Sequence, residues 1–295
     1  MKWRDRKQSS NVDDRRSQPG YTGGGLSLGT IFFLWPFIRT LLRSKSGKLV
    51  IGIGVIAYVG YFVILPRVSG GSGSHVANEQ ADDELAAFIK TVHADTDAVW
   101  SRVFAQAGVR YPSPTLVLYR ESTLSGCGPS GRRMGPFYCP TDQKIYVDLD
   151  FFEDLKRQHG ADGDFAQAYV LAHEVGHHIQ NLEGTLDRVE RAKQIQFGES
   201  RKNALQVRVE LQADCYAGLW ANYAQKQFDM LEEGDVEEAL LAAAAIGDDR
   251  LQKQAQGFSI PHTFTHGRSK QRVEWFYRGF SSGSLAECDT FQATK

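Results

Sequence analysis

The sequence lacks the features that mark several common classes of protein. Its 295 residues carry a formal net charge of only −1, so the overall charge gives no indication of nucleic-acid binding. No Cys-x-x-Cys pattern is present, which argues against a zinc site built from cysteines. The strongest apolar run begins only at Leu49, which is too far from the start for a cleavable signal peptide. The length suits one sizeable soluble domain with additional segments, or two small domains.

Cysteine is scarce, and the four that are present all lie after residue 126: Cys127, Cys139, Cys215 and Cys288. An even number is compatible with two disulfides, with free thiols or with a metal site. Cys127 and Cys139 bracket a loop rich in Gly and Pro, and a bridge between them would restrict that loop. We therefore expect this pair, with Cys215 and Cys288 as a second pair. Disulfides would indicate an oxidising compartment.

The first 48 residues are expected to lie outside any packed domain. We predict that residues 1–25 form a disordered basic tail, because they are polar, end in a Gly-rich stretch and contain six basic residues. Those residues are Lys2, Arg4, Arg6, Lys7, Arg15 and Arg16. Residues 26–48 begin with an apolar stretch that is too short to span a bilayer comfortably. We predict an interfacial or linker segment there.

The longest apolar run, Leu49–Leu65, contains no charged residue. Its 17 residues are at the lower limit for a spanning helix, for which roughly 20 are expected. A buried core helix is the alternative, but the run is apolar on all faces. We predict a transmembrane helix over residues 49–66 and a flexible Gly/Ser-rich linker over residues 67–82.

The distribution of basic residues predicts how the chain is oriented. Basic residues before the predicted span outnumber those just after it, which places the N-terminus in the cytoplasm and the C-terminal domain outside. The expected location is therefore the inner membrane, in a single pass, with a periplasmic catalytic domain. A second span over residues 26–42 would instead return the domain to the cytoplasm.

The soluble domain is expected to occupy residues 83–295 and to be α+β, mostly helical, with a small sheet. Apolar spacing predicts a helix over residues 83–107, and β-branched runs predict strands over 115–119 and 144–147. Four further helices are predicted over 163–182, 202–227, 235–256 and 268–279.

The chemistry is carried by His173, Glu174 and His177, in a segment with a helical apolar pattern. Residues four apart lie on one helix face, so the two imidazoles can bind one metal ion. Glu174 lies about 100° around the helix, where it can reach a water but not share the metal in the same way. A chance match to this five-residue pattern is expected in about one such chain in a hundred, so the context must decide. Gly176 within the motif allows another backbone to come close.

A catalytic zinc needs a third protein ligand and an open position for water. The best candidate is Glu210, with Asp214 four residues later on the same helix face. Two acids at this spacing usually form a solvated face. Their neighbours here are mostly apolar, however, and buried carboxylates need partners. We therefore predict that Glu210 binds zinc and that Asp214 accepts the second ring N–H of His173.

These motifs resemble a known family. His173-Glu-Val-Gly-His-His-Ile-Gln180, followed by Glu210-Leu-Gln-Ala-Asp-Cys-Tyr-Ala-Gly218, is similar to the putative neutral zinc metallopeptidases of bacteria. The basic, aspartate-bearing start of the chain and Phe264-Thr-His-Gly267 extend the resemblance. It implies a membrane-anchored protein with a zincin-like domain in which a glutamate is the third ligand.

Three further histidines are candidates for a role at the site. His178 is turned away from the ligand face by about 100°, which favours packing over metal binding. His262 and His266 lie in a predicted loop before the last helix. One of them could donate a hydrogen bond to the developing oxyanion, and the family resemblance favours His266; the alternative is a histidine bonded to the backbone.

The predicted function is zinc-dependent hydrolysis of peptide bonds with one zinc per chain and Glu174 as general base. Lys144–Asp148 precedes the active helix, and as an edge strand it would bind an extended or unfolded peptide by main-chain pairing. The alternative is a non-enzymatic zinc-binding or partner-binding scaffold. Charged residues close to the motif argue against a protease that cuts within the bilayer. No feature predicts the oligomeric state.

Overall fold

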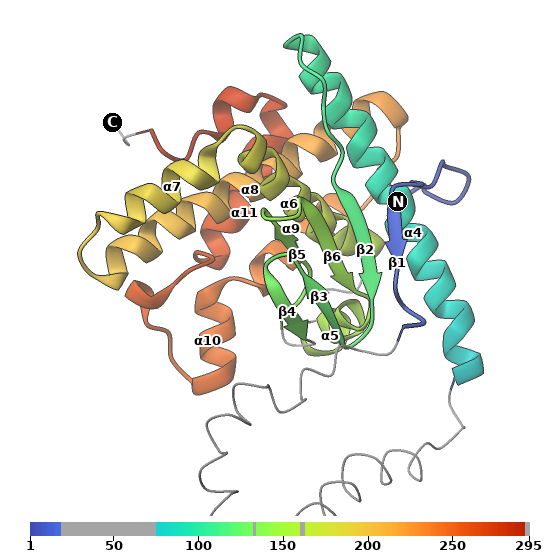
Figure 1. The fold of residues 1–295 in the computed structure, drawn as a ribbon, viewed down its shortest axis with the longest axis horizontal. Coiled ribbons are helices and arrows are strands. Elements are labelled where there is room, and N and C mark those ends of the chain that lie inside the picture. The colour runs from blue at the N-terminus through green and yellow to red at the C-terminus, as the bar shows by residue number, and fades with distance from the viewer. Residues whose placement is uncertain (19–74, 132–133, 160–162, 293–295) are drawn as a thin grey trace, which may run out of the picture. The chain divides into compact units, whose positions relative to one another are not determined.

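The computed structural model describes residues 1–18, 75–131, 134–159 and 163–292, which form a mostly helical α+β domain with a small sheet (Figure 1). The strands are β1 (Val12–Asp14), β2 (Thr115–Tyr119), β3 (Ser122–Ser125), β4 (Gly128–Gly131), β5 (Phe137–Cys139) and β6 (Lys144–Asp148). The α-helices are α4 (His75–Gln106), α5 (Asp150–His159), α6 (Asp164–Leu182), α7 (Thr185–Gln194), α8 (Glu199–Phe228), α9 (Asp235–Ala245), α10 (Asp248–Gln256) and α11 (Ser269–Ser282). Short 3₁₀ turns are η2 (Pro261–Thr263) and η3 (Leu285–Cys288).

The main sheet has the strand order β1-β2-β6-β5. Strands β1, β2 and β6 are parallel, with Val12 opposite Leu116 and Leu116 opposite Ile145, and β5 runs antiparallel to β6. The strand Lys144–Asp148 is therefore internal, and the expectation that it is an edge strand is wrong. Antiparallel pairing with the short β5 covers its outer side. The edge strand on the side of α6, which carries His173 and His177, is therefore β5.

The two faces of the sheet are covered differently. Leu116, Leu118, Ile145 and Val147 are fully buried and join the core formed with the helices. The opposite face is covered by the hairpin of β3 and β4, where the Tyr119 hydroxyl lies 3.2 Å from Ser130 Oγ. Because both faces are covered, the strands read as nearly continuous apolar runs.

The N-terminal segment differs from the prediction of a disordered tail. Residues 1–18 belong to the domain, and β1 extends the sheet. The Met1 ammonium lies 2.8 Å from Asp164 at the start of α6, and Arg6 Nε donates to Asp95 of α4 at 3.0 Å. Three of the basic residues that resembled a solvated tail pair with carboxylates of α4: Arg4 with Glu84, Arg6 with Asp95 and Arg16 with Asp83. The helix α4 also begins at His75, within the predicted linker 67–82 and eight residues before the predicted domain start.

The fold prediction needs a correction on the membrane span. Within the ranges just given, no helix is both long and apolar enough to cross a bilayer, so the transmembrane part of the predicted fold class is withdrawn. The predicted span over residues 49–66 and the predicted interfacial segment 26–48 lie outside the described residues. The architecture that the structure supports is α+β, mostly helical, with a small sheet.

Two disulfides are formed, in the pairing that the sequence led us to expect. Cys127–Cys139 joins the turn between β3 and β4 to the end of β5. Cys215–Cys288 joins the buried middle of α8 to η3, which follows the last helix. The first bridge fixes the β5 edge and the second fixes the C-terminal turn against α8.

The predicted helix over residues 235–256 is interrupted. Helix α9 ends at Ala245 and α10 begins at Asp248, with Gly247 in an extended conformation between them. A β-carbon at Gly247 would lie 2.5 Å from the Ser269 backbone nitrogen, so the chain passes here against the start of α11. The break aims Asp248 toward the loop that carries His266.

Candidate metal centre and catalytic cleft

The candidate metal centre lies where α6 and α8 cross. Gly176 of α6 faces Ala213 of α8, and a β-carbon at Gly176 would come within 3.0 Å of the Ala213 Cα. This close approach turns the face of α6 with His173 and His177 toward Glu210 of α8.

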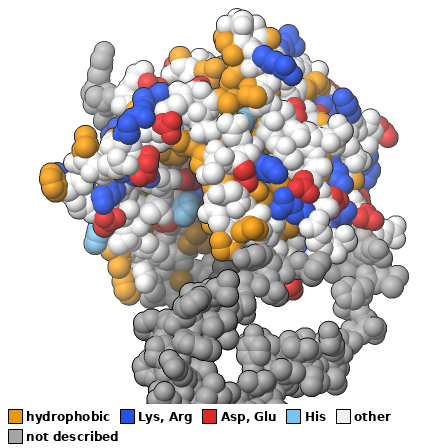
Figure 2. Space-filling model, viewed as in Figure 1, with side chains coloured by type: hydrophobic (Ala, Val, Ile, Leu, Met, Phe, Trp, Pro, Cys, Tyr) orange, Lys and Arg blue, Asp and Glu red, His pale blue; other side chains and the backbone are white. Residues whose placement is uncertain are grey.

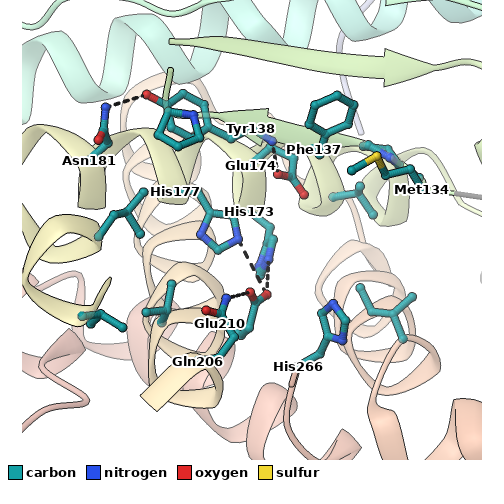
Figure 3. Close-up of a pocket in the computed structure, with 18 of the residues that line it drawn as sticks. Met134, Phe137, Tyr138, His173, Glu174, His177, Asn181, Gln206, Glu210 and His266 are labelled. Carbon is teal, nitrogen blue, oxygen red and sulfur yellow. Dashed lines mark hydrogen bonds and ion pairs between the residues drawn. The ribbon is translucent and has the colours of Figure 1, made fainter. Parts of the chain in front are cut away.

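The three predicted ligands converge in the structure (Figure 3). Nε2 of His173 lies 3.2 Å and Nε2 of His177 lies 3.6 Å from Oε2 of Glu210. One ligand atom from each of the three residues falls within 4.8 Å of the others. Two imidazoles and one carboxylate are the donor set of a catalytic zinc site, so these side chains fit that ion.

The far side of His173 is held by a buried ionic cluster. Its Nδ1 lies 2.9 Å from Oδ1 of Asp214, as predicted for an orienting carboxylate. Asp214 is fully buried and also accepts two bonds from Arg272 at 2.9 Å and one from the Tyr169 hydroxyl at 2.5 Å. The carboxylate of α8 therefore has partners on α6 and α11, and His173 is left with Nε2 facing the ligand cluster.

The far side of His177 is held by an amide. Its Nδ1 lies 2.8 Å from Oε1 of Gln180, whose Nε2 donates to the Val209 carbonyl at 2.7 Å and to Gln212 Oε1 at 3.0 Å. Because the amide nitrogen already donates to oxygen, its oxygen faces the ring and accepts from Nδ1–H. The tautomer that leaves Nε2 free for a metal is the one favoured.

The charges of the cluster depend on one another. Burial alone would lower the pKa of His173, but the adjacent carboxylates, Asp214 first, raise it to about 9. Burial would raise the pKa of Glu210, yet the two imidazoles, His177 first, hold it well below its ordinary value. Without a metal the pocket thus favours a carboxylate beside protonated imidazoles, and a bound cation would take the place of those protons, because histidine binds a metal in its neutral form.

Glu174 points into the cleft from the same helix without joining the ligand cluster (Figure 3). Its Oε2 accepts a hydrogen bond from the backbone N–H of Tyr138 on β5 at 2.8 Å. Burial raises the pKa of this carboxyl, although His177 and His173 oppose the rise. A carboxylate of raised pKa that faces an open cleft is suited to accept and release a proton.

The ligands and Glu174 open into a cleft of about 730 Å³. Hydrophobic and histidine side chains can be seen within a hollow on the face drawn in Figure 2. The apolar lining residues are Met134, Pro136, Phe137, Phe151, Val170, Leu186, Val189, Val209, Ile246 and Leu251. Strand β5, at the edge of the sheet, forms one border of the cleft.

The remaining histidines take separate positions. His266 lines the cleft across from Glu210 (Figure 3), with Nδ1 at 3.2 Å from Asp248 Oδ1. That hydrogen bond raises the pKa of His266, although burial opposes it. His262 is exposed and does not line the cleft. His178 is buried against the Pro112 carbonyl at 2.7 Å and serves packing, as the sequence favoured.

Several residues at the site were not predicted: Tyr138, Tyr169, Gln180, Gln206, Asp248 and Arg272. Two of them carried a local signal, because Gln206 lies one helical turn before Glu210 and Gln180 one turn after His177. Asp248 and Arg272 reach the site from other helices, and sequence spacing alone does not reveal such contacts.

Comparison with known proteins identifies the family. The model for the family described as "Putative neutral zinc metallopeptidase" matches residues 1–291. The chain belongs to this family. It is 46% identical over 298 aligned positions to the uncharacterized protein YpfJ of Escherichia coli (strain K12), with 99% of each chain covered. It is 45% identical over 207 positions, 67% of each chain, to the uncharacterized proteins Mb2605 of Mycobacterium bovis and Rv2575 of Mycobacterium tuberculosis.

No solved structure gave a significant match to this chain. The family match includes residues 1–18, in keeping with the place of β1 in the sheet. A zinc peptidase family and a buried His/His/Glu cluster agree on Zn²⁺ as the metal of this site.

Proposed function

We propose that the chain is a zinc-dependent endopeptidase that holds one zinc ion per chain on His173, His177 and Glu210. The observation that carries the proposal is the cluster of three donor atoms within 4.8 Å, buried at the floor of a cleft. When bound, zinc would lower the pKa of a water and polarise the scissile carbonyl. Three protein ligands leave one position open for water, which distinguishes a catalytic site from a structural one.

Glu174 is assigned the role of general base. Its Oε2 is fixed by the Tyr138 N–H, so Oε1 remains to accept the proton of the attacking water. The raised pKa of this buried carboxyl strengthens it as a base, and it then passes the proton to the leaving amine. Because Glu174 follows His173 by one residue on α6, it does not lie on the helix face that holds the two histidine ligands.

His266 is assigned to stabilise the charge that develops on the carbonyl oxygen. Asp248 binds its ring nitrogen at 3.2 Å and its backbone N–H at 2.6 Å, so both the ring and the loop are held. The raised pKa favours the cationic form of the ring, and an imidazolium N–H facing the cleft is a strong donor to an oxyanion.

The proposed substrate is an extended, unfolded peptide segment. Strand β5 lies at the edge of the sheet and borders the cleft beside Glu174. An extended chain can add to such an edge through main-chain groups other than the Tyr138 N–H, which Glu174 already occupies. Val170, Ile246 and Leu251 contribute an apolar wall to the cleft. That wall favours an apolar side chain next to the scissile bond.

Metal analysis combined with a proteolysis assay on the full chain tests this function. We expect wild type to hold one zinc and to cleave an unfolded protein such as reduced, alkylated lysozyme. E174Q should keep the zinc and lose turnover, whereas H173A should lose both; E274Q, on the exposed face of α11, is the control. A wild-type protein without transition metal would refute the site. Zinc retained without any hydrolysis would instead indicate a non-enzymatic scaffold.

We further propose that the domain works in an oxidising, extracytoplasmic compartment. The support is the pairing of all four cysteines in two disulfides, which persist in such compartments. Alkylation of thiols in intact cells, followed by denaturation and counting of free cysteines, measures the redox state. Four reactive thiols in freshly trapped protein would contradict the proposal.

A further inference from the structure

The ligand Glu210 is held by Gln206 of the same helix, and Gln206 is held in turn by Lys193 of α7. We propose that Gln206 and Lys193 form a hydrogen-bonded pair that positions Glu210 so that a single carboxylate oxygen meets the metal. The inference rests on the proposed zinc site. Asp214 and Gln180 orient the two histidine ligands, and the pair Gln206 and Lys193 would do the same for Glu210.

The first contact separates the two oxygens of Glu210. Gln206 lies one turn earlier on α8, and its Nε2 donates to Oε1 of Glu210 at 2.9 Å (Figure 3). The other oxygen, Oε2, is the one that faces both histidine Nε2 atoms, at 3.2 Å and 3.6 Å. Because Oε1 is engaged by an amide, the carboxylate cannot rotate freely about its own axis. Gln206 therefore selects which oxygen is presented.

The second contact fixes the orientation of the amide. Lys193, near the end of α7, donates from Nζ to Oε1 of Gln206 at 2.6 Å. An ammonium group only donates, so it requires the oxygen of the amide to face it. The nitrogen of Gln206 must then face Glu210. Without Lys193 the amide is free to flip and to present its oxygen to the Glu210 carboxylate, which would repel it.

The setting of the pair gives these contacts weight. The side chain of Glu210 is only 8% exposed and that of Lys193 is 22% exposed, so both groups are largely shielded from water. The competing carboxylate, Glu190, lies farther from Lys193 Nζ, at 3.8 Å, and is 63% exposed. Hydrogen bonds to charged groups are stronger than neutral ones, and more so when they are desolvated. The pair also joins α7 to α8 directly behind the ligand.

Zinc affinity is the quantity that the pair controls. Loss of a side chain that orients a ligand typically weakens metal binding by about 10–100-fold, and we expect a rise of this size in the zinc Kd of Q206M. K193M should raise the Kd by a smaller factor, because the amide remains and only its orientation is released. Q206E should be the most severe change, since it places a second acceptor against Glu210. K193R keeps the donor and should retain the wild-type Kd.

A double-mutant cycle separates this relay from two independent effects. Since Lys193 acts through Gln206, the double variant Q206M/K193M should have the same zinc Kd as Q206M alone. The Kd is measured on the full chain by competition with a chelator of known affinity. Melting temperatures of the metal-free variants show whether the fold is intact. Gln194→Met at the exposed end of α7 and Lys202→Met on α8 are matched controls that should leave the Kd unchanged.

The outcomes distinguish this inference from the proposed function. A wild-type chain that binds no zinc would refute the proposed function itself. Wild-type binding with an unchanged Kd in Q206M and K193M would refute only the positioning pair. Additive Kd effects in the double variant would refute the relay from Lys193 through Gln206, whatever the size of the single effects.

Discussion

Gly176 of α6 and Ala213 of α8 lie in backbone contact at the crossing of the two helices that carry the metal ligands. The Cα and the carbonyl oxygen of Ala213 are each 3.0 Å from the position that a β-carbon on Gly176 would occupy. His177 is one residue after Gly176, and Glu210 is three residues before Ala213. The distance between the helices at this point therefore sets the distance between the histidines and the glutamate.

A side chain at Gly176 should disturb metal binding and stability together. Extra atoms at a closely packed site typically cost about 1–3 kcal/mol, and we expect G176V to reach this range because the obstacle is backbone. G176A should be milder, since alanine also favours the helix. Zinc Kd and the urea midpoint are the measurements, with G131A as the control because nothing lies within 4 Å of that position. Unchanged zinc affinity in G176V would refute the coupling.

Asp214 should matter for both the metal and the fold. In D214N the carboxylate that orients His173 is lost, and the zinc Kd should rise by about 10–100-fold. Arg272, which is almost fully buried, would lose its partner, and breaking a buried ion pair typically costs about 3–5 kcal/mol. Chelator competition and denaturant unfolding measure the two effects. The surface variant E274Q should change neither, and a D214N protein as stable as wild type would contradict the role of the cluster.

The N-terminal segment should contribute to stability through Arg6. Its guanidinium pairs with Asp95, whose side chain is only 6% exposed, and its loss should lower the unfolding free energy by about 1–3 kcal/mol. Arg4 pairs with Glu84 on the surface, where such pairs contribute about 0–1 kcal/mol. R6M should therefore have a clearly lower melting temperature than R4M. Equal melting temperatures would mean that residues 1–18 do not support the domain.

His93 should make the domain sensitive to acid. Burial lowers the pKa of this imidazole to about 4, although the Pro114 carbonyl opposes the shift. In the unfolded chain it ionises near 6.5, so the unfolded state binds the proton first as the pH falls. Stability should be unaffected above about pH 6.5 and should decline by about 3 kcal/mol by pH 4.

The test of His93 is a difference between two proteins. Asp97 lies 4.0 Å away, and burial raises the pKa of its carboxyl to about 6, which acts on stability in the opposite direction. Unfolding free energies of wild type and H93Q should therefore be compared from pH 7.5 to 4. The advantage of wild type over H93Q should shrink below pH 6.5, and a constant difference would contradict the assignment.

The sequence was most informative where the structure is local. A helix places residues four apart on one face, so the pairs His173/His177 and Glu210/Asp214 could be predicted without knowing the fold. The strand Thr115–Tyr119 was also predicted at its observed bounds. The same spacing also relates Gln206 to Glu210 and Gln180 to His177. Both were missed because glutamine is common on helices, and only its position relative to a ligand indicates a role.

Other features depend on contacts that no local pattern encodes. Strand β1 has only three residues, Val12–Asp14, and is ordered by pairing with a strand about a hundred positions later. Its polar sequence gave no strand signal, and the segment resembled a disordered tail. The order of β5 and β6 in the sheet is likewise set by tertiary pairing. The break at Gly247 follows from the approach of Ser269, which belongs to a distant helix.

The parallel pairing of β1 with β2 makes the catalytic domain discontinuous in sequence. The compact unit joins residues 1–21 to residues 82–295, so residues 22–81 are inserted between its two pieces in the sequence. The closure entropy of such an insertion grows only with the logarithm of its length, by about 0.6 kcal/mol for each doubling. Insertions of quite different length and composition are thus compatible with the same metal centre. Evolution can change what the domain is attached to without altering how it is built.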